Sequence, residues 1–235
     1  MNTKVLQIRL EGPLQSWGDR SRFLVKETNW FPTKSGVTGL LFCAMGLSGA
    51  QEAKLAQLAD LRMSVISYSI GRSRPSILED FQMVGNGYDD ANPWENLLIP
   101  KTIEGKKPVG SGAKITYRSY LQDAHFEVFF EIPNDWAMFV EEGLKNPKWD
   151  IYLGRKSCAP TSPVFQGIFD NFEEAEKAFI AQNRNSEIKL IEKIIDTNES
   201  GIDVESVYDV PIRFGRNKKY RERMIKRVVY VSSQK

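Results

Sequence analysis

The chain has 235 residues, of which 41% are hydrophobic and 26% are charged, and its net charge is +2. This balance is ordinary for a soluble globular protein, and a chain of this length can bury a core without disulfides or metals. The first ten residues do not form a signal peptide and the longest apolar stretch, Val37 to Leu47, is too short to span a bilayer, so we expect a cytoplasmic protein.

Hydropathy periodicity then predicts strands and helices in chain order. The alternation of Lys4–Leu10 predicts a strand that Gly12-Pro13 ends, and Thr33 or Ser35 can cap a helix that runs to about Leu47. The later predicted segments are helices over Glu52–Leu61, Asn134–Leu144 (with Trp136 and Phe139 inward) and Asn171–Gln182, and strands over Met63–Ile70, Asp123–Ile132, Ile188–Ile195, Val207–Phe214 and Arg227–Val231.

Residues 71–115 interrupt this pattern, because they hold six glycines, four prolines and little periodicity. So long a loop in a compact domain is usually functional or disordered. The order of the other segments predicts an α+β fold, with a ferredoxin-like, RRM-type antiparallel sheet and helices on one face. We expect residues 1–235 to form a single domain of this kind, with residues 71–120 as an extended arm inserted in it.

The charge is distributed unevenly near the C-terminus. Residues 170–205 carry ten acidic and four basic residues, whereas residues 206–235 carry nine basic and two acidic ones. A charge run is usually a solvated face. The basic block RFGRNKKYRERMIKR also contains Phe214 and Tyr220, and cations interleaved with aromatics favour a polyanion site over a merely soluble surface.

Three short phrases combine glycine with aromatics and hydrogen-bond donors: LEGPLQSWG at 10–18, FPTKSGVTGLL at 31–41 and YLGRKSC at 152–158. Glycine lets a ligand approach the backbone closely. Arg, Lys and Ser donate hydrogen bonds to phosphate, and aromatic rings stack on bases. The phrases therefore predict an RNA-binding surface.

No catalytic set accompanies these phrases in the sequence. GxSxG and a phosphate-binding GK[ST] loop are absent, and two cysteines with one histidine are too few for a self-contained zinc site. His125 is expected on the same strand face as Glu127, and a lone strand histidine is more often a surface or satisfied core residue than a general base. We expect no metal and no cofactor.

The phrases also carry a family resemblance. GPLQSWG after the first strand, followed by FPTKSGVTGLL, resembles the start of Cas-five proteins, in the branch that serves type I-E CRISPR Cascade complexes. The resemblance covers most of the chain in order and is weakest over 86–114 and 170–205. It continues through DFQMV at 80–84, TYRSYLQDAHF at 116–126, YLGRKSCAPTSPVF at 152–165, and DVPIRF at 209–214 with Tyr220 and Arg223 downstream.

The resemblance implies a structural subunit that grips the five-prime handle of CRISPR RNA. Such proteins cap the filament of backbone subunits beside the large subunit that reads the PAM, near the PAM-proximal end of the target DNA. They have an RRM-like palm and a thumb hairpin that wedges against the guide RNA. The arm at 71–120 corresponds to that thumb.

Particular residues fit these roles. Arg118 matches the thumb-base arginine and suits a base edge or a phosphate, although a surface ion pair is the alternative. Tyr152 can stack on a base with Leu153 beside it, Gly154 permits close approach, and Arg155 and Lys156 offer donors. The alternative for YLGR is a turn between helix and strand with Tyr152 in the core.

Further candidates lie in the other phrases. Gln15 and Trp17 follow the first strand, where Trp17 is almost equally expected as a core residue, and Lys34 and Ser35 stand at a helix N-terminus that favours phosphate. Ser35 can instead merely cap that helix. The basic block adds candidates for the handle's path or for a neighbouring subunit: Arg213, Arg216, Lys218 and Arg221.

Two alternatives remain open at this point. Some Cas-five relatives are metal-independent ribonucleases that process precursor RNA with a Tyr/Lys/His-type constellation. Here His125 is the only histidine and is not beside a lysine in sequence, so the resemblance implies the non-cleaving branch. The other alternative is an unrelated RRM-like binding module in another complex.

Overall fold

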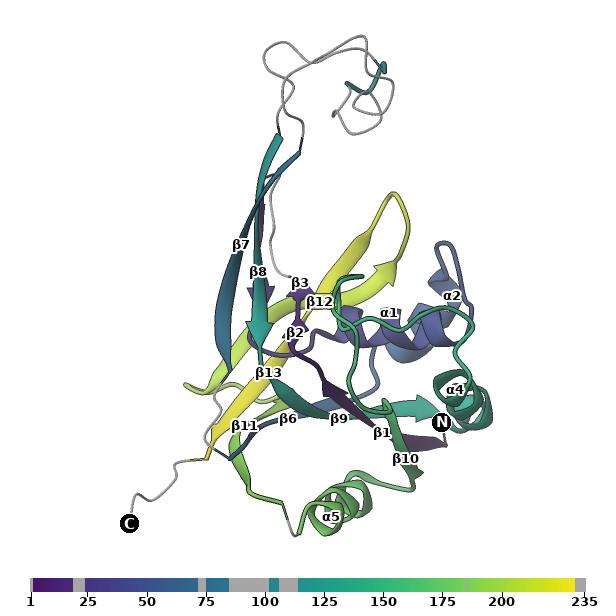
Figure 1. The fold of residues 1–235 in the computed structure, drawn as a ribbon. Coiled ribbons are helices and arrows are strands. Elements are labelled where there is room, and N and C mark those ends of the chain that lie inside the picture. The colour runs from purple at the N-terminus through teal and green to yellow at the C-terminus, as the bar shows by residue number, and fades with distance from the viewer. Residues whose placement is uncertain are drawn as a thin grey trace.

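The computed structural model describes residues 2–18, 24–71, 75–84, 102–105, 114–184 and 186–230. These ranges form a mixed α+β protein around a large antiparallel sheet (Figure 1). In spatial order its seven strands are β10 (Phe165–Phe169), β1 (Thr3–Glu11), β9 (His125–Pro133), β6 (Met63–Ile70), β11 (Ile188–Asp196), β13 (Lys219–Val229) and β12 (Val204–Arg213).

The alternation read in the sequence decides which face each strand side chain occupies. In β1, Leu6, Ile8 and Leu10 are fully buried on one face, and β1 pairs with β9 from Thr3↔Pro133 to Glu11↔His125. Because successive strand side chains point to opposite faces, Val5 lies on the other face. The predicted strands at 4–10, 63–70, 123–132 and 188–195 are confirmed to within two residues at each end.

Helices cover both faces of this sheet. The main core lies under α1 (Lys34–Ala44), α2 (Glu52–Leu58) and α4 (Ala137–Lys145), which follows the 3-10 turn η1 (Asn134–Trp136). The helix α5 (Phe172–Gln182) packs on the opposite face, where Ala175 and Phe179 contact Val5 and Phe129 (Figure 1). The expectation of helices on one face only is therefore wrong, because the strands are apolar on both sides at β1, β9 and β6.

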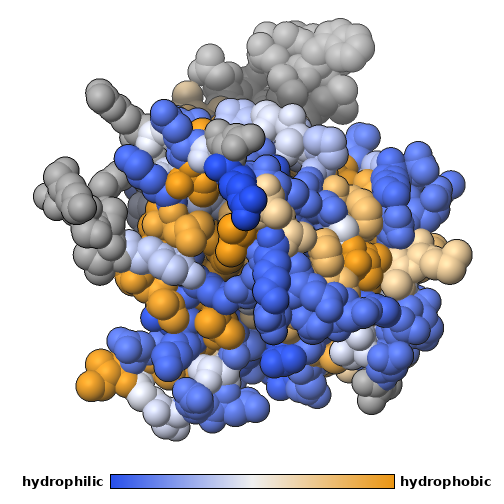
Figure 2. Space-filling view, turned by 90° about the horizontal axis from the view of Figure 1, so that it is seen from below, coloured by the Kyte–Doolittle hydropathy of each residue, from blue (hydrophilic) through white to orange (hydrophobic). Residues whose placement is uncertain are grey.

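Seen from the α5 side, the surface mixes hydrophilic side chains with several separate hydrophobic patches (Figure 2). Exposed apolar residues on this side include Ile180 of α5 and Ile70 of β6. No helix within the described ranges is long and apolar enough to cross a membrane.

The predicted helices are present with small changes. Thr33 caps α1, because its Oγ1 accepts the N–H of Gly36 at 3.2 Å, and the helix ends at Ala44 rather than near Leu47. In α4 the buried stripe is Val140, Gly143 and Leu144. Phe139 falls outside that stripe and is 50% exposed, so its predicted inward orientation is wrong.

Two long strands form a hairpin, one within the segment 71–115 that was expected to be irregular and one mostly after it. β7 (Ser76–Val84) pairs with β8 (Lys114–Gln122) in continuous register, from Ser76↔Gln122 to Val84↔Lys114. Along one face of this hairpin Phe81, Met83 and Tyr117 are exposed, so little burial pattern marks the strands in the sequence. The rest of the expected arm, at 85–101 and 106–113, lies outside the described residues.

Short strands connect the hairpin to the large sheet. β8 pairs with β2 (Leu14–Gln15) and, in parallel, with β4 (Val25–Lys26), and β3 (Trp17–Gly18) pairs with β5 (Thr28–Asn29). The chain after β1 therefore lies between the base of the hairpin and α1. This placement brings the first glycine phrase close to the other two.

Candidate nucleic-acid interface

Two adjoining cavities, of about 350 and 480 Å³, form a groove beside the N-terminus of α1. The residues that line both cavities are Ser16, Gly18, Ser35, Gly154, Lys218 and Tyr220. They come from the three glycine phrases and from the β12–β13 hairpin. Segments that are far apart in the sequence thus line one surface, which we call the groove.

Gly154 joins two of these segments by direct backbone contact. The N–H of Ser16 donates to the carbonyl of Leu153 at 3.0 Å, and Gly154 has a φ of +93°. A Cβ on Gly154 would lie 1.7 Å from the Ser16 carbonyl oxygen, so only glycine fits here. Leu153 is fully buried beneath this turn, so its side chain packs in the core under the groove.

Gln15 and Trp17 stabilise the same corner from inside the protein. Trp17 is fully buried, its Nε1 donates to Gln15 Oε1 at 3.1 Å, and the amide of Gln15 donates to the carbonyls of Leu10 and Ala124. A Cβ on Gly36 would lie 2.9 Å from the Trp17 ring. Their burial supports the core alternative for Trp17, which also borders the first cavity, and the RNA contact of these two residues stays a prediction.

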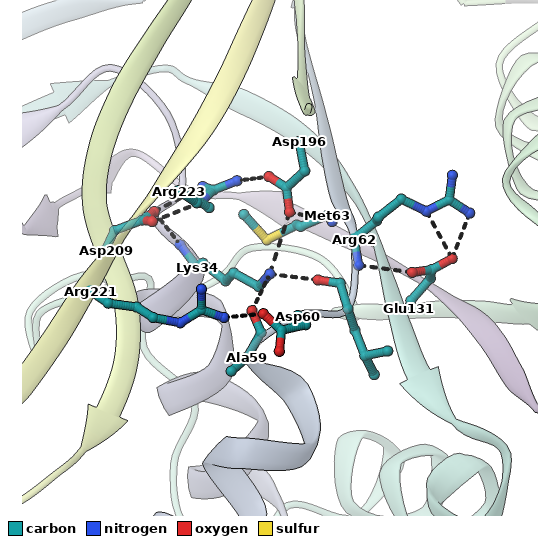
Figure 3. A network of polar contacts seen from close by, with 11 residues as sticks. Lys34, Ala59, Asp60, Arg62, Met63, Glu131, Asp196, Asp209, Arg221 and Arg223 are labelled. Atoms are coloured by element: carbon teal, nitrogen blue, oxygen red, sulfur yellow. Dashed lines mark hydrogen bonds and ion pairs between the residues drawn. The ribbon is translucent and has the colours of Figure 1, made fainter. Parts of the chain in front are cut away.

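Lys34 is also turned inward, away from the groove. Its Nζ donates to the carbonyls of Ala59 and Leu61 and lies 3.3 Å from Asp196 Oδ2, and the residue is 2% exposed (Figure 3). Burial lowers the pKa of Lys34, against the opposing effect of Asp196. The side chain of Lys34 is therefore engaged in internal contacts, and its RNA contact stays a prediction. Ser35, which follows it, remains on the groove.

An ionic network lies behind this helix end. Arg223 binds Asp209 through two hydrogen bonds, Nε to Oδ1 at 2.7 Å and Nη2 to Oδ2 at 2.8 Å, and it also contacts Asp196 (Figure 3). Asp196 accepts the backbone N–H of Met63 as well, at 3.0 Å. Although burial opposes it, the pairing with Asp209 and Asp196 raises the pKa of Arg223.

Arg155 bridges the groove and the base of the β7–β8 hairpin. Its guanidinium donates to the carbonyls of Ser119 and Lys26, at 3.1 and 2.7 Å, and lies 4.7 Å from the centre of the Tyr120 ring. Arg155 thus lines the second cavity with most of its hydrogen-bonding capacity already used. Arg118, paired in register with Asp80 and Lys26, is half-buried on the hairpin and is not among the residues that line either cavity.

The remaining basic candidates differ in position. Arg213 lies 3.3 Å from Glu52 and Arg221 forms an ion pair with Asp60, so both are paired at the surface. Arg216 lies in the exposed turn of the hairpin, and Lys156 is exposed next to the Gly154 turn. Lys218 is the basic hairpin residue that lines both cavities.

Aromatic side chains form much of the groove wall. Tyr152, Phe214 and Tyr220 line the first cavity, and Tyr208 joins Tyr220 in the second. The sequence reasoning did not select Ser16, Tyr208 or Asp209 as site residues. The DVPIRF resemblance included Asp209 without giving it a role.

His125 lies elsewhere, on the α5 side of the sheet. Its Nδ1 is 3.5 Å from Glu11 Oε1 and its ring stacks on Tyr68 with centroids 5.6 Å apart, while Tyr68 donates to the same carboxylate at 2.8 Å. The adjacent His125 side chain, against the opposing effect of burial, lowers the pKa of Glu11 to about 2. The predicted shared face of His125 and Glu127 is confirmed, and burial raises the pKa of Glu127 to about 7.

Comparison with known proteins shows the family to which this sequence is similar. Residues 5–231 match the sequence model of the family described as CRISPR-associated protein (Cas_Cas5). The Escherichia coli (strain K12) protein named CRISPR system Cascade subunit CasD is 30% identical over 170 residues, which is 69% of this chain and 70% of that protein.

Solved structures share the fold. A chain of a structure titled CRISPR RNA-guided surveillance complex superimposes with a TM-score of 0.72 at 22% identity, over 96% of this chain and 89% of that one. A structure titled Crystal structure of Cas protein gives a TM-score of 0.57 at 26% identity, over 96% and 94%. The family match spans nearly the whole chain, including every segment that lines the groove, and the chain therefore belongs to the Cas5 family of CRISPR-associated proteins.

Proposed function

We propose that this protein is a non-catalytic RNA-binding subunit of a type I-E Cascade surveillance complex, and that its groove binds the five-prime handle of CRISPR RNA. The observation that carries the proposal is the convergence of three separate glycine phrases and the basic hairpin on one groove. The relative named as a Cascade subunit supports the assignment to that complex.

The groove offers a distinct partner for each part of a single-stranded nucleotide. Ser35 at the N-terminus of α1 and the ammonium of Lys218 suit a phosphate, because helix N–H groups and a nearby cation both favour an anion. Tyr152 and Tyr220 suit a stacked base. Gly18 and Gly154 leave the backbone open to the sugar-phosphate chain, since neither carries a side chain.

The remaining surfaces suit the other partners of such a complex. The strand order β10-β1-β9-β6 supports an RRM-type palm within one domain, and the β7–β8 hairpin would be its thumb, with Arg118 near the thumb base. In this arrangement the subunit caps the filament of backbone subunits. It would adjoin the large PAM-reading subunit at the PAM-proximal end of the target DNA, in antiviral defence or RNA-guided DNA targeting within the cytoplasm.

Fluorescence anisotropy with a handle RNA and a scrambled RNA tests the proposal. Tyr152→Ala is expected to weaken handle binding by roughly 1–3 kcal/mol, the usual loss of one stacked base. Tyr230→Ala, at an exposed tyrosine that does not line the groove, is the matched control and should leave the affinity unchanged. Equal affinity for the two RNAs, in the free subunit and in the assembled complex, would refute handle recognition.

The two cysteines allow an independent footprint. Cys43 lines the first cavity, whereas Cys158 is 1% exposed. Burial raises the pKa of the Cys43 thiol, so alkylation is measured at pH 8.5, where more thiolate forms. Handle RNA should slow alkylation of Cys43 at saturating concentration. An unchanged rate with bound RNA would place the RNA outside the groove.

A further inference from the structure

Asp209 places a carboxylate beside the N-terminus of α1, the end of the groove that most favours a phosphate. Its Oδ2 accepts the backbone N–H of Lys34 at 2.7 Å, at the first position of α1, and Asp209 also lines the second cavity. The residue next to Lys34, Ser35, lines both cavities. A carboxylate here stabilises the positive end of the helix dipole, but it also opposes any phosphate placed in the groove.

Arg223 is the group that offsets this charge. Its guanidinium makes both hydrogen bonds to Asp209 and also contacts Asp196, while its side chain is only 8% exposed. Lys34 completes the cluster through its contact with Asp196. The charges of the two carboxylates and the two cations sum to zero (Figure 3). Because the cluster is buried, removing any one of the four leaves an uncompensated charge.

The same contacts join the two walls of the groove. Asp209 belongs to β12 and Arg223 to β13, so the pair holds the hairpin that carries Lys218 and Tyr220. The hydrogen bond from Lys34 then fixes this hairpin to α1, which carries Ser35. One hydrogen-bonded chain, Arg223 to Asp209 to the α1 N-terminus, therefore sets the spacing of the walls.

We infer that Arg223 is a positioning residue for the groove: it holds Asp209 against the N-terminus of α1 and cancels the carboxylate's charge, which makes that end of the groove accept an anion. The anion is RNA phosphate insofar as the proposed function holds. Arg223 itself stays buried behind the wall and does not touch the ligand.

Charged thiol reagents measure this potential without any RNA. Cys43 lines the groove, so its rates with an anionic and a cationic methanethiosulfonate report the local charge. Arg223→Gln should lower the anionic-to-cationic rate ratio by about twofold at low ionic strength, since the uncompensated carboxylate at the other end of α1, about 13 Å along the helix, repels the anion. Adding Asp209→Asn to that variant should restore the ratio. Arg227→Gln makes the same change in net charge on the same strand and should move the ratio far less.

An unchanged ratio in folded Arg223→Gln, or a drop equal to that of Arg227→Gln, overturns the inference. If Arg223→Gln fails to fold, the single variant Asp209→Asn tests the inference in its place. Asp209→Asn should raise the anionic-to-cationic rate ratio at Cys43 by about twofold, because it removes the charge of the carboxylate. A ratio that does not rise in Asp209→Asn also overturns the inference.

Handle RNA supplies the second readout. Arg223→Gln should lose about tenfold in affinity and the double variant should recover most of it, whereas Arg223→Lys, which keeps the charge, should lose less. If the wild-type protein binds handle and scrambled RNA equally, the proposed function fails while the thiol ratio still decides the role of Arg223. A double variant as weak as Arg223→Gln, with wild-type binding intact, counts against charge cancellation.

Discussion

The groove side and the α5 side of the large sheet both bury charged groups, but they do so differently. On the groove side, Asp196 and Asp209 each accept hydrogen bonds from Arg223 and from a backbone N–H. On the α5 side, Glu127 is bound by Arg9 at 3.0 Å and by Gln7. There the buried Nη2 of Arg9 and Oε1 of Gln7 have no hydrogen-bond partner within the described ranges.

The two sides differ in how fully their buried carboxylates are hydrogen-bonded. On the groove side, the fork of Arg223 and backbone donors bind both carboxylates and hold the walls in place. Glu127 is fully buried with fewer donors, and burial raises its pKa to about 7, which allows it to become neutral. Four predictions test this contrast, from the largest expected effect to the smallest.

The largest effect is expected at Asp196. Asp196→Asn removes a charge that Arg223 and Lys34 share, and breaking a buried ion pair by removing one partner costs about 3–5 kcal/mol. Urea unfolding at pH 7 measures the loss in free energy of unfolding. Asp60→Asn, which breaks the pair of an 86% exposed carboxylate with Arg221, should cost less than about 1 kcal/mol. Similar losses for the two variants would show that the network is not a special source of stability.

The next effect concerns the backbone contact that forms the groove. Gly154→Ala combines a left-handed φ with a clash against the Ser16 carbonyl, whereas Gly49→Ala has a similar φ of +85° and open space around it. We expect Gly49→Ala to cost about 1–2 kcal/mol and Gly154→Ala at least about 2 kcal/mol more. Thermal unfolding compares them. Equal losses would mean that the turn moves freely away from Ser16.

The third prediction concerns Glu127 on the α5 side, which should make the free energy of unfolding depend on pH. The folded-state pKa of Glu127, about 7, lies above its unfolded value near 4.5, so the folded state binds more protons between these values. Stability should therefore fall as pH rises from about 5 to 7, by at most about 1.4 kcal/mol per pH unit from this group. Glu127→Gln should remove that fall, measured by urea unfolding at pH 5 and 7.5.

Two features keep this pH test specific. Glu11, with its pKa lowered to about 2, gives stability that is present above about pH 4.5 and is lost only below it, outside the window. Glu131→Gln, on the same strand and face as Glu127, is the control variant. If wild type and Glu127→Gln change in parallel between pH 5 and 7.5, Glu127 stays charged and the contrast between the two sides disappears.

The smallest effect is expected at His125. His125→Ala should change handle affinity by less than twofold, because the histidine lies with Glu11 and Tyr68 and does not line the groove. Incubation with repeat RNA in EDTA tests the ribonuclease alternative in the same preparation. Site-specific cleavage by the wild-type protein that His125→Ala abolishes would favour that alternative and would move the functional site to the α5 side.

Strands were predicted well where apolar and polar residues alternate along the sequence. Lys4–Leu10 and Met63–Ile70 alternate in hydropathy, and the structure places strands there, although β6 is buried on both faces and includes buried serines. Periodicity did not identify β7 and β8, because the hairpin contributes to the core only near its base, at Tyr120 and Leu121, and little burial patterns the rest. A hairpin in this arm was expected from the family resemblance alone. Prediction failed for Phe139, since a 3-10 turn precedes α4 and the buried stripe begins at Val140.

The site was predicted in its segments but only partly in its residues. Glycine, aromatic and basic phrases located most of the groove, but not the part lined by Lys26, Glu27 and Asn29. Composition cannot tell, however, whether a lysine side chain points outward or into a buried network. Lys34 points inward and contacts residues 59, 61 and 196. The pairing of Arg223 with Asp209 depends on the β12–β13 register, which no short phrase contains.

The hydrogen bond between Lys34 and Asp209 spans 175 positions of the chain. Contacts of such sequence separation form late, because their loop-closure entropy must be overcome before they add stability. During synthesis α1 leaves the ribosome long before β12 and β13 exist. A truncated or nascent chain can therefore have the first two glycine phrases and still lack the groove, which forms only once β12 and β13 have been made.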